Sequence, residues 1–156
     1  MSVNYRGPVH TSPAGVGLDR FRSLSVSAKA LIHQSGHFLL QHRDNIPDIW
    51  HPDHWGLFGG EVEIWETPEQ GLLRELEEEL GWQASYPVYL IPWHPRPDST
   101  IHIFAVELDV LISELKLREG AGMELVGLKE MESLKLTPEI RHNFEVLKNI
   151  AGILFS

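Results

Sequence analysis

The stretch from Thr67 to Gly81 carries both the start and the stop signals of an α-helix, and no other part of the chain constrains the fold as strongly. Thr67 is a favourable N-cap, Pro68 suits the first helical position, and Gln70 completes a capping box. Gly81 is a natural C-terminal stop. Between these signals, leucines recur at helical spacing at positions 72, 73, 76 and 80. The pattern predicts an amphipathic helix over residues 68–80 whose leucines face the core.

The predicted helix also carries an acidic cluster. Glu75, Glu78 and Glu79 stand at the spacing i, i+3, i+4, which brings them onto one face. We expect this face to point away from Leu76 and Leu80. Carboxylates this close resist ionising together, so such a cluster is either well solvated or holds a hard divalent cation such as Mg²⁺.

Elsewhere the periodicity predicts a mixture of strands and helices. A hairpin is expected from residues 25–33 and 37–42, which flank a turn at Gly36. Further short strands are predicted over residues 55–58, 86–93, 101–110 and 124–128, with a loop over 45–55. A last helix starts at Thr137-Pro138, and its inner stripe consists of Ile140, Phe144, Leu147 and Ala151. This order favours an α/β (α+β) fold, in which helices cover both faces of a mixed sheet.

The length of 156 residues suits one domain with a single core. We predict a flexible N-terminal arm over residues 1–20, which are rich in Gly, Pro and Ser, and one domain over residues 21–156. The net charge of −9 disfavours nucleic acid and anionic membranes as partners. Without cysteine the chain has no disulfide, thiolate metal site or cysteine nucleophile. No signal peptide or bilayer-spanning apolar run is evident, so a cytoplasmic location is expected.

The acidic helix lies within a motif that resembles the Nudix box. The box consists of Gly, five residues, Glu, seven residues, Arg-Glu, an aliphatic residue, any residue, Glu-Glu, any residue, Gly and an aliphatic residue. The matching positions are Gly60, Glu66, Arg74, Glu75, Leu76, Glu78, Glu79 and Gly81, and the departure is Trp82 at the last position. Glu77 occupies an unconstrained position, where a solvated side chain is expected. The resemblance implies a Nudix-type α/β/α sandwich with a mixed β-sheet and a central Nudix helix.

The resemblance also implies roles for the residues of the box. Glu78 and Glu79 would bind the metal together with the Gly60 carbonyl, and Glu75 would be either a further ligand or the catalytic base. Arg74 would orient a carboxylate, although a simple pair with Glu78 is an equal alternative. The cofactor implied is Mg²⁺, with Mn²⁺ as a substitute.

Several further residues are candidates for supporting or substrate-binding roles. Glu66 is expected to fix the loop before the helix, and Gly59 to let the backbone approach the substrate. Glu119, followed by Gly120, resembles the additional metal ligand or base of MutT-type relatives, or is an ordinary loop glutamate. Arg43 could bind a phosphate or a base, or lie on the surface. Trp65 could stack on a base.

By this resemblance the chain is a Mg²⁺-dependent hydrolase that cleaves the diphosphate bond of a nucleoside diphosphate linked to another group. A nucleoside triphosphate is the favoured small-molecule substrate, while nucleotide sugars and ADP-ribose stay open. Oxidised dGTP is disfavoured because residues 134–143, LKLTPEIRHN, do not clearly show the expected asparagine. The alternatives are a nucleotide-sensing module without catalysis, an isoprenoid diphosphate isomerase and an RNA-decapping enzyme. Whether a homodimer forms stays open.

Overall fold

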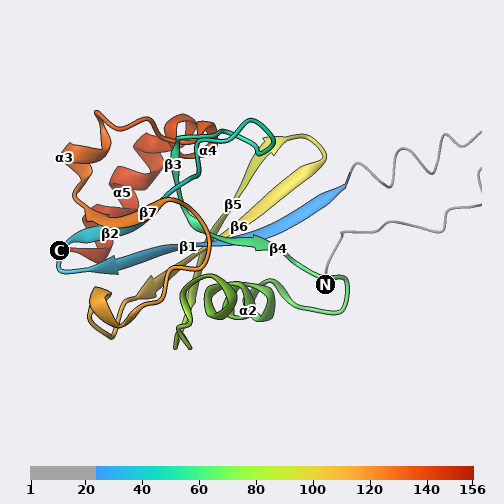
Figure 1. Cartoon of the computed structure of the whole chain (residues 1–156), viewed down its shortest axis with the longest axis horizontal. Helices are drawn as coiled ribbons and strands as arrows, with labels where there is room; N and C mark the ends of the chain where they lie inside the picture. Colours follow the sequence, from blue (N-terminus) through green and yellow to red (C-terminus); the bar gives the residue numbers. More distant parts are fainter. Residues whose placement is uncertain (1–23) are drawn as a thin grey trace, which may run out of the picture.

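The computed structural model describes residues 24–156, which form a seven-stranded mixed sheet with helices on both faces (Figure 1). The predicted arm over residues 1–20 lies outside the described residues. The strands are β1 Ser25–Gln34, β2 His37–His42, β3 Trp55–Gly56, β4 Phe58–Glu61, β5 Val88–Arg96, β6 Ser99–Glu107 and β7 Gly122–Val126. The predicted fold class is therefore confirmed.

Strand β1 organises the sheet because both of its edges are paired. Along one edge it runs parallel to β6, from Ser25 opposite Ser99 to His33 opposite Glu107. The other edge is shared, since β4 pairs with residues 27–30 and β2 with residues 33–34, both antiparallel. Strand β2 in turn pairs with β3 and β7, and β5 forms the far edge beside β6.

Helix α2, Pro68–Leu80, covers one face of the sheet and forms as predicted. The Thr67 side chain accepts from the Gln70 amide and the Gln70 side chain accepts from the Thr67 amide, which completes the capping box. Gly81 ends the helix in the left-handed conformation with φ 62°. Leu72, Leu76 and Leu80 are fully buried in the core cluster between α2 and the sheet.

The opposite face is covered by α3 Leu128–Met131, α4 Pro138–His142 and α5 Phe144–Leu154. The predicted inner stripe is buried there, within a second core cluster. A short 3-10 helix, Ile112–Glu114, follows β6. In residues 24–156 no helix is both long and apolar enough to cross a bilayer.

Two predicted elements differ in the structure. Residues 55–58 form two strands instead of one, because the chain leaves β2 after Gly56 and continues against β1 from Phe58. The last helix is interrupted at Asn143, whose side-chain Nδ2 donates to the Glu139 carbonyl at 2.8 Å. Asparagine competes in this way with the helical hydrogen-bond ladder, which explains the break between α4 and α5.

Candidate metal and phosphate site

The two glycines of β4 allow the acidic helix to approach the sheet closely. Gly59 has φ 133°, and a Cβ at this position would lie 2.7 Å from the Lys29 Cα. A Cβ on Gly60 would lie 2.6 Å from the carboxyl carbon of Glu75. Both distances are below van der Waals contact, so only glycine lets this strand pack between β1 and the α2 carboxylates.

Glu79 points toward the interior, which corrects the expectation that all three glutamates face away from the leucines. Its side chain is buried, and its Oε1 accepts a hydrogen bond from the Gly59 amide at 3.0 Å. Residue 79 lies three positions after Leu76, so a buried helix stripe includes it. Burial raises the pKa of the Glu79 carboxyl to about 8; the charges of Glu119 and Glu75 act in the same direction, and the Gly59 hydrogen bond and Lys29 oppose them.

Glu75 is affected by the charge of Glu119 in the same way as Glu79. The pKa of Glu75 is raised, chiefly by burial, while Arg74 opposes the shift and the charges of Glu78 and Glu119 add to it. The backbone of Glu119 is held because Gln41 Nε2 donates to its carbonyl at 3.0 Å. The charge of Glu119 therefore acts on both Glu75 and Glu79, although it comes from a segment that is distant in the sequence.

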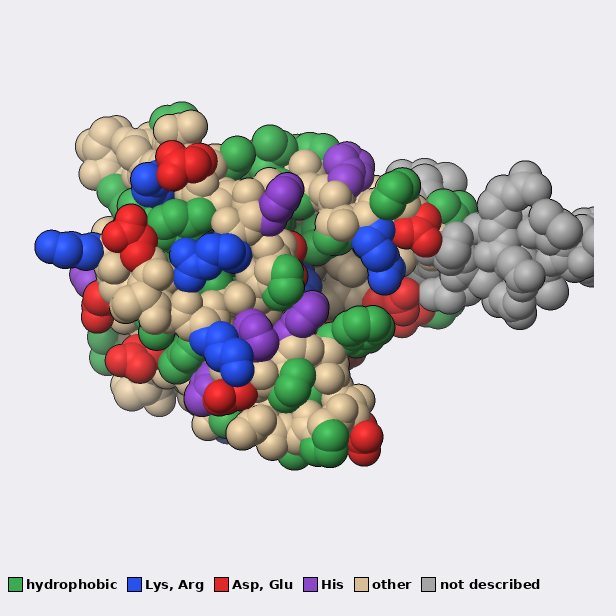
Figure 2. All heavy atoms as spheres, turned by 90° about the horizontal axis from the view of Figure 1, so that it is seen from above, with side chains coloured by type: hydrophobic (Ala, Val, Ile, Leu, Met, Phe, Trp, Pro, Cys, Tyr) green, Lys and Arg blue, Asp and Glu red, His purple; other side chains and the backbone are tan. Residues whose placement is uncertain are grey.

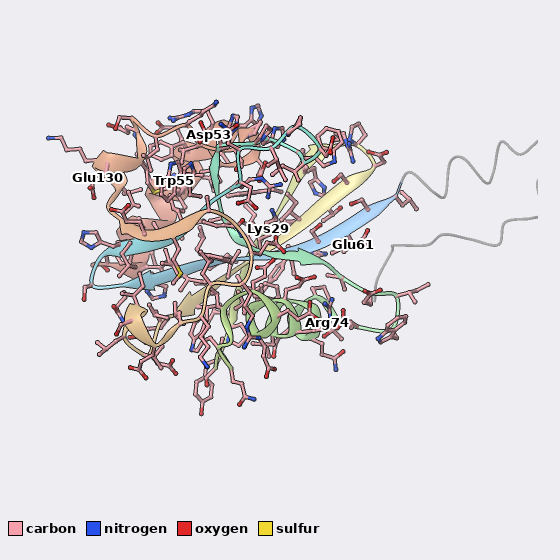
Figure 3. All side chains as sticks on the ribbon, in the orientation of Figure 1. Lys29, Asp53, Trp55, Glu61, Arg74 and Glu130 are labelled. Carbon is pink, nitrogen blue, oxygen red and sulfur yellow. The ribbon has the colours of Figure 1, made fainter. Side chains whose placement is uncertain are left out.

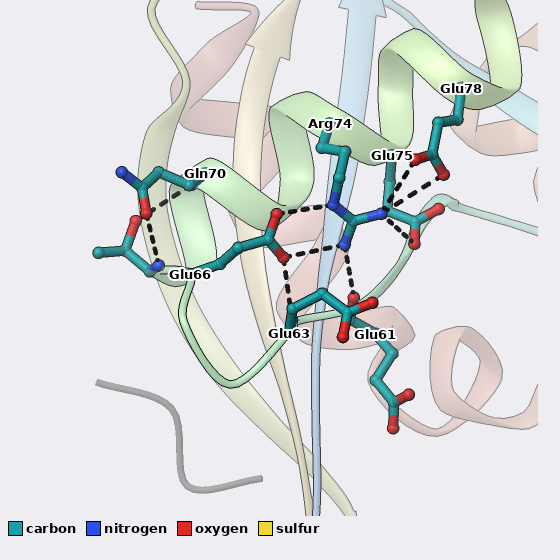
Figure 4. Close-up of polar contacts among 8 residues, drawn as sticks. Glu61, Glu63, Glu66, Gln70, Arg74, Glu75 and Glu78 are labelled. Atoms are coloured by element: carbon teal, nitrogen blue, oxygen red, sulfur yellow. Dashed lines mark hydrogen bonds and ion pairs between the residues drawn. The ribbon is translucent and has the colours of Figure 1, made fainter.

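Arg74 is the hub of the polar contacts on α2 (Figure 4). Its guanidinium donates twice to Glu66, at 2.6 and 2.9 Å, in a bidentate pair that lowers the pKa of the Glu66 carboxyl. It also donates to the Glu61 carbonyl at 3.1 Å. The longer contacts, both 3.3 Å, reach Glu75 and Glu78. Arg74 thus orients carboxylates and also makes the i,i+4 pair, and Glu66 secures it against the loop after β4.

The remaining box glutamates are solvent-exposed. The Glu78 side chain is 58% exposed beside Arg74. Glu77 is exposed as expected for an unconstrained position. Among residues 24–156, no three His, Asp or Glu side chains are already arranged to hold a metal ion.

The donor set fits a hard divalent cation. Carboxylates and a backbone carbonyl supply the oxygen ligands that Mg²⁺ and Mn²⁺ prefer. The raised pKa values of Glu75 and Glu79 reflect burial and negative charge that nearby cations do not fully offset. A bound divalent cation would remove this penalty.

A cavity of about 550 Å³ lies on the sheet face that α4 and α5 cover. Its walls come from β1, the loop before β3, the β3–β4 connection, the β5–β6 hairpin and the start of α4. Figure 2 shows the molecule from this side, where histidine and basic side chains gather. The volume is in the range of small-molecule sites.

Lys29 connects this cavity to the acidic helix. It lies in the middle of β1, between Arg74 on one side of the sheet and Trp55 on the other (Figure 3). Its side chain lines the cavity, and its charge lowers the pKa of the Glu79 carboxyl. One side chain of β1 thus lines the cavity while its charge acts on a carboxylate of α2.

The two other candidate residues for substrate binding differ in placement. Arg43 lines the large cavity and also a smaller one that includes Glu119, and its Nε donates to the Trp50 carbonyl at 2.8 Å. Trp65 is 77% exposed in the loop after β4 and lines neither of these two cavities.

Sequence reasoning did not identify Lys29 or Glu139 as site residues. The Glu139 carboxylate lies in the cavity, 4.0 Å from the Lys29 ammonium. A signal for Lys29 was available, because it is the only charged residue in the strand SVSAKALIHQ. Glu139 carries no such signal, since an acidic residue in the first turn of a helix is favourable in any case.

Comparison with known proteins identifies the family. The model of the NUDIX domain matches residues 22–149. The chain therefore belongs to the NUDIX domain family.

Two curated relatives match about half of the chain. An ADP-ribose pyrophosphatase of Bacillus subtilis (strain 168) is 36% identical over 81 residues, covering 49% of this chain and 44% of the relative. The nucleoside triphosphatase NudI of Klebsiella pneumoniae (strain 342) is 35% identical over 74 residues, covering 47% of this chain and 51% of the relative. The match thus spans about half the length of each relative.

The fold likeness extends further than the sequence likeness. The crystal structure of a MutT NUDIX hydrolase from Burkholderia pseudomallei superposes with a TM-score of 0.65 at 24% sequence identity. The superposition covers 78% of this chain and 95% of that chain. This likeness shows that the mixed sheet with helices on both faces is the Nudix fold.

Proposed function

We propose that this chain is a divalent-cation-dependent hydrolase that cleaves a diphosphate bond of a nucleoside triphosphate. The observation that carries the proposal is the packing of Glu75 and Glu79 against the glycine strand β4, where the charge of Glu119 acts on both. A cavity of about 550 Å³ lies on the other face of the same sheet. The names of the two curated relatives, a pyrophosphatase and a nucleoside triphosphatase, support the reaction class.

The cation would be held by the Gly60 carbonyl with Glu75, Glu78, Glu79 and Glu119. Bound there, it supplies charge neutralisation at the phosphate oxygens and lowers the pKa of a bound water. Glu75 has two candidate roles, because it is half-buried and Arg74 holds it near Gly60. It either completes the ligand set or accepts the proton of the attacking water.

The reaction takes place at one phosphorus atom, and side chains of the protein position the reacting groups around it. The water oxygen forms a bond to phosphorus while the bond from phosphorus to the bridging oxygen breaks. The electron pair of the broken bond leaves with the departing phosphate. Lys29 and Arg43 stand at the cavity where they can bind the non-bridging oxygens, and Arg74 keeps the glutamates oriented.

The proposal is tested by a hydrolysis panel with Mg²⁺ and with Mn²⁺. The panel contains nucleoside triphosphates, ADP-ribose, nucleotide sugars and dinucleoside polyphosphates, with identification of the products. We expect release of pyrophosphate or phosphate from a triphosphate. Glu78→Gln and Glu79→Gln should each lower kcat/KM at least about 100-fold, because each removes an anionic ligand.

Glu77→Gln is the matched control, since Glu77 is an exposed neighbour on the same helix. It should keep turnover at the wild-type level, and chelation of divalent cations should stop turnover in both proteins. Unchanged rates in Glu78→Gln and Glu79→Gln would refute the mechanism. Hydrolysis of ADP-ribose or a nucleotide sugar in place of triphosphates would select the second candidate, and nucleotide binding without turnover would indicate a sensing module.

A further inference from the structure

The segment that carries Glu119 is tied to the end of helix α2. The Lys116 amide donates to the Leu80 carbonyl and the Arg118 amide donates to the Glu79 carbonyl, both at 2.8 Å. These bonds satisfy carbonyls that the last turn of a helix leaves without an intrahelical partner. The residue directly before Glu119 is therefore bonded to the backbone of the buried glutamate of α2.

Strand β2 holds the other side of the same segment. The Gln41 side-chain Nε2 donates to the Glu119 carbonyl at 3.0 Å, and the Ala121 amide donates to the His42 carbonyl at 2.8 Å. Gly120 lies between these bonds with φ 98°, and a Cβ on it would lie 2.9 Å from the His42 carbonyl oxygen. The segment thus approaches β2 closely because residue 120 has no side chain.

Gln41 is a polar residue in an otherwise buried part of β2. It is only 3% exposed and follows Leu39 and Leu40, which are fully buried. Side chains alternate across a strand, so Gln41 lies on the same face as Leu39, whose side chain packs in the cluster under α2. A buried amide is costly unless it is hydrogen-bonded, and the Glu119 carbonyl accepts from it. This contact distinguishes Gln41 from its apolar neighbours.

The direction of the Glu119 carboxylate depends on these backbone contacts. Glu119 is exposed, and within residues 24–156 its carboxylate makes no hydrogen bond or ion pair. Its charge nevertheless acts on Glu75 and Glu79. Since no side-chain contact fixes the carboxylate, the backbone of residue 119 determines where it can reach. A fixed backbone also leaves less conformational entropy to lose when the carboxylate binds a ligand.

We propose that Gln41 is a positioning residue, which holds the Glu119 backbone so that the Glu119 carboxylate contributes to divalent-cation binding. This inference rests on the proposed function, since it concerns the cation site of that reaction. Gln41 acts through Glu119 and does not itself touch the cation. Residues that orient a metal ligand typically change metal affinity by about 10- to 100-fold when they are replaced.

The test measures Mn²⁺ binding to the full chain, which requires no turnover. The electron paramagnetic resonance signal of free Mn²⁺ gives the dissociation constant. Gln41→Met keeps an unbranched side chain of similar length and removes the amide, so we expect about 10-fold weaker binding. Glu119→Gln should also weaken binding. The double variant should stay within about 2-fold of Glu119→Gln alone, because Gln41 acts through the carboxylate that is already lost.

Gln34→Met is the matched control. The Gln34 Nε2 also donates to backbone carbonyls, those of Leu108 and Val110, both at 2.9 Å. Gln34 pairs with His37 beside the β1–β2 turn, at the opposite end of the hairpin from Gln41. Its replacement should lower the melting temperature but leave the Mn²⁺ affinity within about 2-fold of the wild type.

A second substitution covers the case in which Gln41→Met does not fold. Gln41→Asn keeps a buried amide that is one methylene too short to hold the Glu119 carbonyl, and it should show the same loss of Mn²⁺ affinity. Unchanged Mn²⁺ affinity in the folded Gln41 variant would overturn the proposal. Additive losses in the double variant, or unchanged affinity in Glu119→Gln, would overturn it as well.

The outcome is separable from that of the proposed function. Weaker Mn²⁺ binding in Gln41→Met, in a protein that hydrolyses no nucleotide, would refute the proposed function alone. Hydrolysis by the wild type, together with unchanged Mn²⁺ affinity in Gln41→Met, would refute this inference alone.

Discussion

At the scale of single residues, the three glutamates of α2 differ because their surroundings differ. Glu79 is buried against β4 and has a pKa raised to about 8, while the Glu78 side chain is more than half exposed. Glu75 lies between them in exposure and contacts Arg74. The same side-chain chemistry thus supplies one carboxylate that is protonated at neutral pH without a cation and one that is solvated.

The raised pKa of Glu79 predicts how the stability of the cation-free protein depends on pH. Between its ordinary value of 4.5 and about 8, the folded state keeps a proton that the unfolded state has released. The contribution of Glu79 to folding stability should therefore be highest below pH 4.5. It should fall as the pH rises from 4.5 to about 8. The loss relative to Glu79→Gln should reach on the order of 4 kcal/mol by pH 8.

Thermal unfolding of wild type and Glu79→Gln at a series of pH values, with a chelator present, measures this difference. Glu77→Gln should follow the wild-type slope, because its side chain is exposed. Added Mg²⁺ should stabilise the wild type more at pH 8 than at pH 5, since it binds the ionised carboxylate. Parallel pH profiles for wild type and Glu79→Gln would contradict the assignment.

At the scale of elements, the site depends on how closely β4 and α2 approach each other. Helix α2 is specified locally by its capping box and by Gly81. Strand β4 depends on the absence of side chains, because Gly59 and Gly60 leave room for Lys29 on one side and for Glu75 on the other. Neither element positions the glutamates alone.

Gly59→Ala should destabilise the protein by about 3 kcal/mol or more. The added methyl would meet the β1 backbone, and φ 133° is strained for any residue with a side chain. Chemical denaturation measures the effect. The matched control is Gly152→Ala in α5, where a Cβ meets nothing within 4 Å and helix propensity predicts a gain of about 0.5–1 kcal/mol. Equal effects of the two substitutions would refute the role of Gly59.

At the scale of the whole molecule, one sheet separates two core clusters. One lies under α2 and supports the acidic site, and the other lies under α4 and α5 and supports the cavity. Strand β1 contributes residues to both clusters, and its Lys29 pairs with Gly59 of β4.

We therefore predict that a chain shortened to residues 22–156 keeps its stability and activity. The family match begins at residue 22, and the shortened chain keeps every described residue of both clusters. Its melting temperature should stay within about 3 °C of the full chain, because no core contact described here is removed. A loss of cooperative unfolding would show that the predicted arm over residues 1–20 belongs to the domain.

Much of this arrangement could be predicted from local signals. The capping box at Thr67, the leucine repeat and Gly81 predicted α2. Alternation predicted β1, and the turn at Gly36 predicted β2 as its hairpin partner. These signals act between residues within a few positions of each other, so they can be recognised in the sequence without knowledge of the fold. The spacing of the box also placed Gly60, Arg74 and the glutamates in one segment.

What the sequence alone determined is the acidic helix, its glycine strand and the Nudix family to which they belong. Only the tertiary structure decided that Glu79 is buried, that Arg74 is held by Glu66, and that Lys29 meets Glu139 across a cavity. Lys29 and Glu139 are 110 positions apart, and their approach follows from packing α4 over β1. Packing depends on the whole chain, and therefore a contact between such distant residues leaves no local pattern in the sequence.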